Sequence, residues 1–350
     1  MTPVAPMRIA VLLDWTADPR AQADLAPELE RAGADLIWVP EAYGHDAPTL
    51  LGAIAARTER VLVGPGVLSV YSRTPALLAQ TAAGLDALSG GRAVLGLGTS
   101  GAQVVEGFHG VPFTRPLDRL RETVALCRAV WRREPLAHRG RALQIPVPAG
   151  RGTGLGRPLR TATRPLRESV PIHIAALAPG SVALAAEVAE GWFPLLFAPE
   201  HAERAWGAPL ADGRARRDPA LPPLDVCAAV HCAVGPERDV AALRARARAE
   251  LALYIGGMGS AERNHYADAA AAFGWAGAAR TVQRLFLSGA RDEAAAALPE
   301  DLVRALTACG PPAHVGERLA ALRAAGVTTL CVRPLGDPVR TVAAVREIAG

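Results

Sequence analysis

The sequence contains no lysine, so all 38 of its basic residues are arginines. Acidic residues nearly balance them, and the formal net charge is only +4. Aromatic residues make up 5% of the chain, and no basic stripe is interleaved with them. This distribution argues against a nucleic-acid-binding surface, whereas the modest positive balance favours a small anionic ligand.

Cysteine is also scarce, and its five positions are scattered without any C-x-x-C pair. This excludes a disulfide framework and predicts reduced thiols in a cytoplasmic protein. No apolar run approaches the roughly 20 residues of a membrane span. The first residues lack a charged start followed by an apolar segment, so we expect neither an export signal nor membrane attachment.

A metal site is not predicted either. His231 and Cys232 are adjacent on a predicted strand, so their side chains point to opposite faces of the sheet. The chain has no H-E-x-x-H motif and no paired cysteines.

The stretch from residue 90 to residue 110 organises the rest of the chain. Residues 93–97 form a short apolar run between turn residues, which predicts a buried parallel strand. This run leads into Gly98, Thr99, Ser100 and Gly101, whose small side chains let backbone N–H groups approach a ligand. Because ligands of α/β proteins bind at the carboxyl ends of strands, we expect a flat cofactor beside this loop.

Three of these glycines also spell G-x-G-x-x-G, at Gly96, Gly98 and Gly101. A dinucleotide-binding fold requires that motif to open a full helix. Here barely one turn separates it from Gly107, and three strand–helix units precede it. A dinucleotide fold is therefore disfavoured.

Strands and helices alternate along most of the chain. Strands are predicted at residues 8–13, 35–39, 60–63, 93–97, 172–176, 192–197, 224–234 and 327–332. Two segments interrupt this alternation of strands and helices. One, at 137–169, is rich in Gly, Pro and Arg, and the other, at 239–299, is largely helical. Eight such units predict a (β/α)₈ TIM barrel over residues 1–350, a single domain with insertions after strands four and seven.

The chain resembles the bacterial luciferase-like family of flavin and deazaflavin oxidoreductases. The resemblance covers nearly the whole chain, and it is closest to the actinobacterial branch that uses coenzyme F420. It is carried by W-V-P-E at 38–41, R-T-E-R-V at 57–61, R-T-P at 73–75, L-S-G-G-R at 88–92, L-G-L-G-T-S at 95–100, E-G-W at 190–192, Y-I-G-G-M-G at 254–259 and A-G-V at 325–327.

The resemblance implies a cofactor ring in the carboxyl-terminal mouth of the barrel, held at three places. The first is Gly66 and Val67, where relatives carry a non-prolyl cis peptide; Gly64-Pro65 is the alternative position here. The second is the loop from Gly98 to Gly101. The third is a small-residue turn into a helix, whose N-terminus suits the phosphodiester of the F420 tail; it comprises Ala175, Ala176, Leu177, Ala178, Gly180 and Ser181.

Candidate catalytic residues follow the second and third predicted strands. Glu41 and His45 could transfer a proton, and Arg73 could bind a carboxylate or phosphate. The alternative for Glu41 is an ion pair with Arg73. His109 and Tyr254 are candidate substrate contacts.

Relatives that oxidise a sugar phosphate carry a histidine and a glutamate where this chain has Ala42 and Gly101. That activity is therefore disfavoured. The leading prediction is an F420-dependent oxidoreductase that transfers hydride between the deazaflavin and an activated C=C, C=N or carbonyl group of a small substrate. The alternatives are an FMN-dependent monooxygenase of the same fold and a flavin-binding protein without turnover. By analogy with the family we expect a homodimer.

Overall fold

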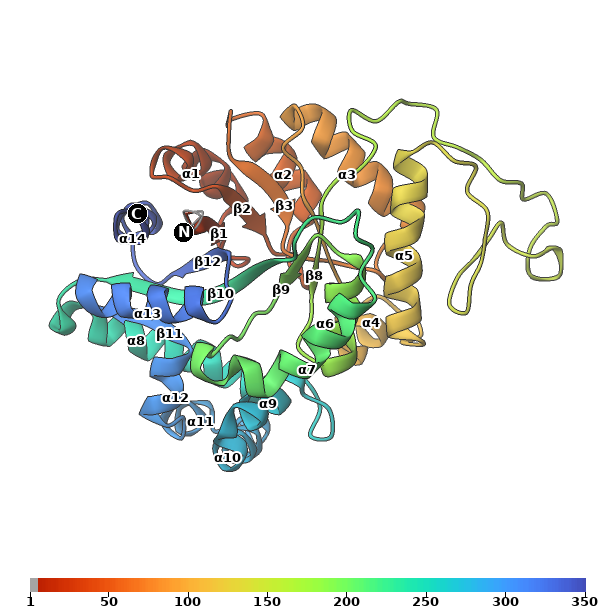
Figure 1. The fold of residues 1–350 in the computed structure, drawn as a ribbon. Helices are drawn as coiled ribbons and strands as arrows, with labels where there is room; N and C mark the ends of the chain where they lie inside the picture. The colour runs from red at the N-terminus through yellow and green to blue at the C-terminus, as the bar shows by residue number, and fades with distance from the viewer. Residues whose placement is uncertain (1–5) are drawn as a thin grey trace.

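The computed structural model describes residues 6–350, in which eight parallel strands form a closed barrel (Figure 1). Around the barrel the strands follow the order β3-β2-β1-β12-β10-β9-β8-β5. A parallel bridge between Val63 and Ala93 joins β3 to β5 and closes the circle. The TIM-barrel prediction is confirmed. The barrel strands are β1 (Arg8–Leu12), β2 (Leu36–Val39), β3 (Leu62–Pro65), β5 (Leu95–Gly98), β8 (Ile172–Ala175), β9 (Gly191–Phe193), β10 (Asp225–Val234) and β12 (Thr329–Pro334).

Helices surround these strands on all sides (Figure 1). Several of them begin at an Asp or Thr cap with proline directly after it, as at Asp18, Thr74 and Asp337. The cap oxygen accepts a free backbone N–H, and proline fits the first turn because its missing N–H is not needed there. The surrounding helices are α1 (Pro19–Arg31), α2 (Ala47–Ala55), α3 (Pro75–Ser89), α5 (Pro116–Trp131), α6 (Pro179–Val188), α7 (Ala202–Ala215), α13 (Pro312–Ala324) and α14 (Pro338–Ala349).

The barrel interior is filled by a small apolar cluster distinct from the larger core between strands and helices. Trp38 stacks on Phe193 in its middle, with ring centroids 5.2 Å apart. Because side chains alternate along a strand, the members of this cluster identify which residues of each strand point inward. The cluster comprises Ala10, Leu12, Leu36, Trp38, Val94, Phe193, Cys227, Ala229 and Cys331. All five cysteines are buried, and none forms a disulfide.

A polar cluster occupies the amino-terminal end of the barrel interior. Asp225 accepts hydrogen bonds from Thr329 at 2.7 Å and pairs with Arg8 at 2.7 Å and with His173 at 2.8 Å. Burial raises the pKa of Asp225, but its bond to His173 and the charge of Arg8 outweigh burial and hold it well below the usual range. This network closes the end of the barrel opposite the mouth.

Three details of the barrel differ from the sequence-based expectation. The sixth strand ends at Phe193 instead of residue 197, because Pro194 has no N–H to continue the ladder. The small-residue turn that ends at Ser181 overlaps the helix after the fifth strand, because α6 begins at Pro179. Two short strands were not predicted, β4 (Leu68–Ser69) beside β5 and β11 (Thr307–Gly310) beside the end of β10.

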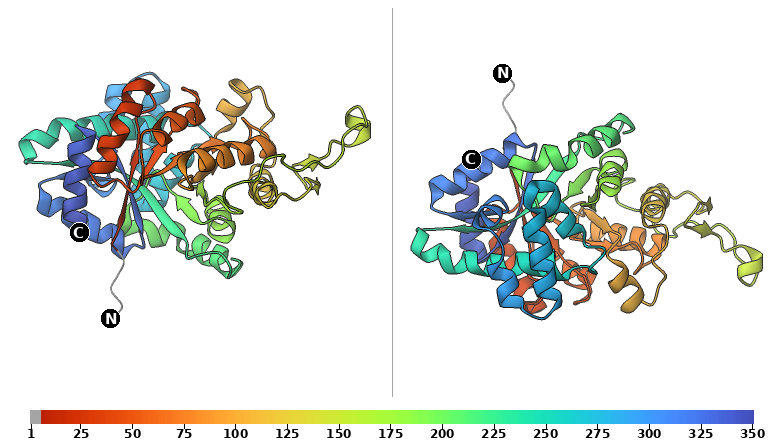
Figure 2. Two further views of the ribbon diagram at one scale, coloured as in Figure 1. Left: turned by 90° about the horizontal axis from the view of Figure 1, so that it is seen from above. Right: turned by 90° about the horizontal axis from the view of Figure 1, so that it is seen from below.

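The segment after α5 forms an arm that projects away from the barrel (Figure 2). It contains the antiparallel pair β6 (His138–Arg139) and β7 (Gln144–Ile145) and the 3₁₀ turn η1 (Ala149–Arg151). The base of the arm is anchored by Glu122, which accepts backbone N–H groups of three residues from 141 to 143. We keep the term arm for residues 137–169.

The segment after β10 is helical. Within residues 6–350, no helix is long and apolar enough to cross a membrane. The remaining helical elements are α4 (Ala102–Gly107), η2 (Pro199–His201), α8 (Glu237–Ala252), η3 (Leu253–Gly257), α9 (His265–Ala270), η4 (Ala271–Trp275), α10 (Ala276–Leu287), α11 (Arg291–Ala296) and α12 (Glu300–Ala305).

Candidate functional site

The three small-residue turns meet at the carboxyl-terminal mouth of the barrel. A Cβ placed on Gly98 would lie 2.9 Å from a methyl of Val67 and 3.8 Å from the Cβ of Ala175. Val67 and Ala175 are partly exposed and pack on the interior cluster below them. Segments that are far apart in the sequence therefore share one surface at this end of the barrel.

The strands β3 and β5 approach so closely that side chains are excluded between them. A Cβ on Gly96 would lie 2.0 Å from the carbonyl oxygen of Pro65 and 2.9 Å from a methyl of Val67. The peptide bond between Gly66 and Val67 is cis, at the pair that the family resemblance implied. We call this contact between β3 and β5 the glycine seam.

The loop after β5 leads into the short helix α4. Gly101 caps that helix by accepting the N–H groups of Val104 and Val105 at 3.1 and 3.0 Å. Ser100 adopts a left-handed conformation with φ 58°, and Thr99 is only partly exposed. The backbone of this loop therefore turns at the mouth without large side chains to cover it.

The turn from Ala175 to Ser181 is held in place by two tryptophans. The indole N–H of Trp192 donates to the carbonyl of Ala176 at 2.9 Å, and that of Trp206 donates to Leu177 at 2.9 Å. Ala178 and Gly180 continue the turn into α6, and Ser181 closes it by donating to the Ala178 carbonyl at 2.8 Å.

The catalytic candidates Glu41 and Arg73 are bound to each other. Two N–O contacts of 2.6 and 2.8 Å join them, and both side chains are largely buried. Glu41 also accepts the N–H of Ala47, and Arg73 also pairs with Asp46. The carboxylates of Glu41 and Asp46 therefore both lie at the start of α2. The hydrogen bonds that Arg73 donates to Glu41 raise the pKa of Arg73. The group is a clamp between the loops after β2 and β3.

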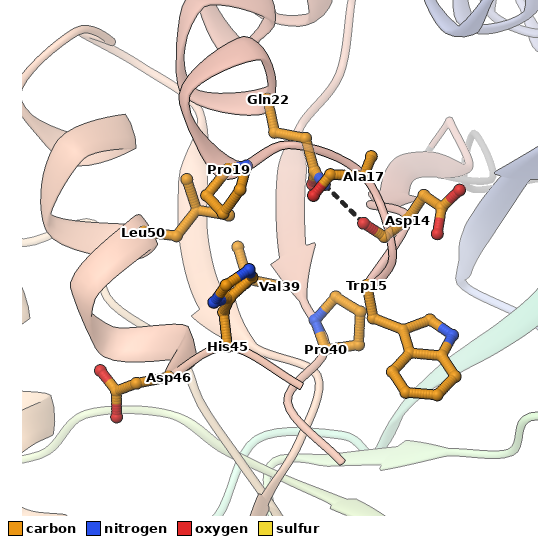
Figure 3. A pocket seen from close by; sticks show the side chains of 10 residues that line it. All are labelled: Asp14, Trp15, Ala17, Pro19, Gln22, Val39, Pro40, His45, Asp46 and Leu50. Carbon is orange, nitrogen blue, oxygen red and sulfur yellow. Dashed lines mark hydrogen bonds between the residues drawn. The ribbon is translucent and has the colours of Figure 1, made fainter. Parts of the chain in front are cut away.

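His45 is exposed and directly precedes Asp46, the Arg73 partner that Figure 3 draws near it. Its ring lines a small pocket between the loops after β1 and β2. Gln22 closes the far side of that pocket by donating to the carbonyl of Asp14, the dashed line in Figure 3. The pocket is lined by Asp14, Trp15, Ala17, Pro19, Gln22, Val39, Pro40, His45, Asp46 and Leu50.

Aromatic side chains from three loops touch in series at the rim of the mouth. Trp15 meets Tyr43 edge to face at 5.2 Å, Tyr43 meets Phe108 at 6.5 Å, and Phe108 meets His109 at 5.2 Å. Phe108 is 65% exposed. The substrate candidate His109 thus lies at one end of an aromatic rim.

The other substrate candidate, Tyr254 of η3, belongs to a polar group that joins β10 and β12 to α8 and η3. Glu250 of α8 accepts from His231 at 2.9 Å and from Arg333 at 2.7 Å, using the same carboxylate oxygen. The Arg333 guanidinium stacks over the Tyr254 ring at 5.1 Å, and Tyr254 packs on Tyr266. We call the group of His231, Glu250, Tyr254 and Arg333 the polar wall.

Burial sets the protonation of the polar wall. Desolvation, reinforced by the charge of Arg333, lowers the pKa of His231 to about 4, so this histidine is neutral at pH 7. Burial alone would raise the pKa of Glu250, but bonding to His231 and the charge of Arg333 lower it. Glu250 is therefore a carboxylate, and its negative charge neutralises the positive charge of Arg333.

Sequence reasoning missed His231, Glu250 and Arg333 as site residues. A signal existed for two of them, since alternation with Cys227 and Cys331 places His231 and Arg333 on the inner face of the barrel. No sequence signal brings Glu250 to them. Among residues 6–350, no group of three or more His, Cys, Asp or Glu side chains is arranged to hold a metal ion.

The sequence pattern of the family described as luciferase-like monooxygenase matches residues 3–329. A proposed coenzyme F420-dependent oxidoreductase of Mycobacterium tuberculosis is 39% identical over 341 residues, 95% of this chain and 96% of that protein. Among solved structures, a coenzyme F420-dependent tetrahydromethanopterin reductase from Methanopyrus kandleri superimposes with TM-score 0.79 at 22% identity, covering 98% of both chains. A type II Baeyer–Villiger monooxygenase from Pseudomonas putida in complex with FMN reaches TM-score 0.69 at 18% identity, again over 98% of both chains. At these identities the solved structures show the common fold alone.

Proposed function

The chain belongs to the luciferase-like monooxygenase family, and on that premise we propose that it is a coenzyme F420-dependent oxidoreductase acting on a small organic substrate. The relative that is 39% identical over nearly its whole length supports F420 as the cofactor. When bound, F420 supplies a two-electron hydride donor or acceptor. In the reducing direction the substrate carbon gains hydride, and its neighbouring atom gains a proton.

We propose that the mouth accommodates a planar ring. A Cβ on Gly98 would lie 2.9 Å from a methyl of Val67, so a larger residue there would displace Val67 beside the glycine seam. We propose that Gly66, Val67 and the loop through Thr99, Ser100 and Gly101 hold the ring by backbone contact. The turn formed by Ala175, Ala176, Leu177, Ala178, Gly180 and Ser181 would bind the phosphodiester of the tail through backbone N–H groups at the start of α6.

The remaining candidates divide into two roles. Glu41 and Arg73 compensate each other, so we propose that they act by fixing the loops after β2 and β3. His45 is exposed beside them, and we propose it as the residue that moves a proton. The absence of acid–base side chains at Ala42 and Gly101 argues against sugar-phosphate oxidation.

The observation that carries this proposal is the convergence of the three turns on Gly98, whose Cβ position lies near both Val67 and Ala175. The experiment is a parallel titration of the purified chain with F420 and with FMN, followed by cofactor fluorescence. We expect F420 to bind and FMN to bind far more weakly. Tight FMN binding without F420 binding would instead support an FMN-dependent monooxygenase. F420 binding followed by no turnover of any C=C, C=N or carbonyl compound tested would support a carrier.

A further inference from the structure

The polar wall lies directly across the barrel from the glycine seam. The seam joins β3 to β5, and the order of the eight strands places β12 and β10 at the opposite point of the circle. On these two strands His231 and Arg333 are direct neighbours in register. Both follow inward-pointing cysteines by alternation, so both face the barrel axis near the strand ends.

The surface between the seam and the wall is apolar. Leu12 belongs to the interior cluster. Val67, Ala175 and Leu195 are partly buried and pack against that cluster. A charged guanidinium beside such a surface requires a specific explanation, because burying an arginine without full pairing is unfavourable.

The hydrogen bonding of Arg333 is incomplete. Its Nη2 donates to Glu250, and its face covers the Tyr254 ring. Its Nη1 is buried and has no hydrogen-bond partner among residues 6–350. A ligand that brought an acceptor to this donor would satisfy it.

The charge of the wall indicates which acceptor fits. Glu250 already neutralises Arg333 at 2.7 Å, and His231 is uncharged at pH 7, so the group carries no net charge. A carboxylate or phosphate would find no unbalanced positive charge. A neutral carbonyl oxygen finds a fixed N–H donor, and that donor interacts more strongly as the oxygen gains negative charge during reduction.

We propose that Arg333 binds the oxygen of a neutral carbonyl substrate through Nη1, with His231, Glu250 and Tyr254 fixing the guanidinium. This assignment rests on the proposed function and narrows its substrate class from C=C, C=N or C=O to ketones and aldehydes. It makes Arg333 a substrate-binding residue and the other three positioning residues.

The test uses the full chain loaded with oxidised F420, so that no turnover occurs, and cyclohexanone labelled with ¹³C at the carbonyl as the probe. Hydrogen bonding to Arg333 should move the bound carbonyl resonance downfield. Arg333→Met and Arg333→Lys should abolish that movement and weaken binding at least about tenfold. Arg333→Lys keeps a charge for Glu250, which guards against loss of folding. Arg244→Met is the matched control, because Arg244 is similarly buried and pairs with Glu237 away from the mouth.

A second arm uses cyclohexanecarboxylate as the anionic probe. Wild-type protein should bind it more weakly than the ketone, and Glu250→Gln should reverse that order by leaving Arg333 uncompensated. The proposal is overturned if the ketone does not bind, if its resonance moves equally in the Arg333 variants, or if wild type prefers the carboxylate. F420 binding is measured separately by fluorescence, and that measurement tests the proposed cofactor. The ketone titration is also repeated without F420, so that the role of Arg333 is tested even if F420 does not bind.

Discussion

Arg73 and Glu41 follow neighbouring barrel strands and are joined by two N–O contacts of 2.6 and 2.8 Å. Their side chains are only 14% and 11% exposed. Glu41 also accepts the first N–H of α2, so the pair ties a helix terminus to the loop that follows the glycine seam. The two residues that sequence reasoning proposed separately for chemistry thus form one mechanical unit.

We expect Glu41→Gln and Arg73→Met each to lower the free energy of unfolding by about 2 kcal/mol, because each leaves a largely buried partner unpaired. The double variant should lose little more than either single one, since the same interaction is removed. Urea denaturation measures all three. Arg57→Ala, which breaks the exposed pair with Asp24, should change stability by less than about 0.5 kcal/mol. Unchanged stability with lost turnover in Glu41→Gln would assign Glu41 to chemistry instead.

Gly98→Ala should weaken F420 binding about tenfold, because the new methyl would displace Val67 from its position. Fluorescence titration provides the affinity. Gly84→Ala on α3, outside the loop after β5, is the matched control, since its Cβ would meet no atom within 4 Å and its helical backbone suits alanine. Equal affinities in both variants would show that the ring does not lie against this loop.

His231 makes the stability of the chain depend on pH. Its pKa is about 4 in the folded protein, below the ordinary value of 6.5, so the unfolded chain takes up the proton first. The contribution of His231 to the free energy of unfolding is complete above pH 6.5. This contribution, about 3 kcal/mol, is lost as the pH falls toward 4. Glu250 and Arg333 are the charged groups that face this histidine, and protonation of Glu250 belongs to a lower pH range.

Urea denaturation between pH 7.5 and 4.5 checks this expectation. His231→Gln should flatten the dependence, whereas His265→Gln, at an exposed histidine, should retain the wild-type slope. A slope that survives in His231→Gln would place the responsible group elsewhere.

We also propose that the arm is an insertion that the barrel does not need. Residues 151–160 are exposed throughout, and Arg151 and Arg160 offer trypsin sites, whereas proline follows Arg157 and Arg164 and blocks cleavage there. Brief digestion should cut at Arg151 and Arg160 first and leave F420 affinity unchanged. Mass spectrometry locates the cuts, and loss of affinity on cutting would instead make the arm part of the site.

Much of the fold could be predicted because its signals are local. The Thr74-Pro75 pair marks a helix start, and the apolar run before Gly98 marks a buried strand. The meeting of Gly98, Val67 and Ala175 was also predictable, since carboxyl ends of parallel strands share one face.

The polar wall could not be predicted, because its assembly depends on how far β10 extends beyond the barrel. β10 has ten residues and pairs in turn with β9, β12 and β11, so it extends beyond the barrel before α8 returns to the mouth. That return path brings Glu250 to His231 and Arg333, and no spacing in the sequence specifies it. The end of β9 at Phe193 was missed for a simpler reason, because the apolar residues continue after Pro194 although the ladder cannot.

The glycine seam is built from main chain, whereas the wall across from it is built from side chains. A point mutation replaces a side chain at once, but it alters the path of a backbone only by disturbing everything packed on it. The wall can therefore be altered one side chain at a time, whereas a substitution in the seam shifts backbone on which the rest of the mouth packs.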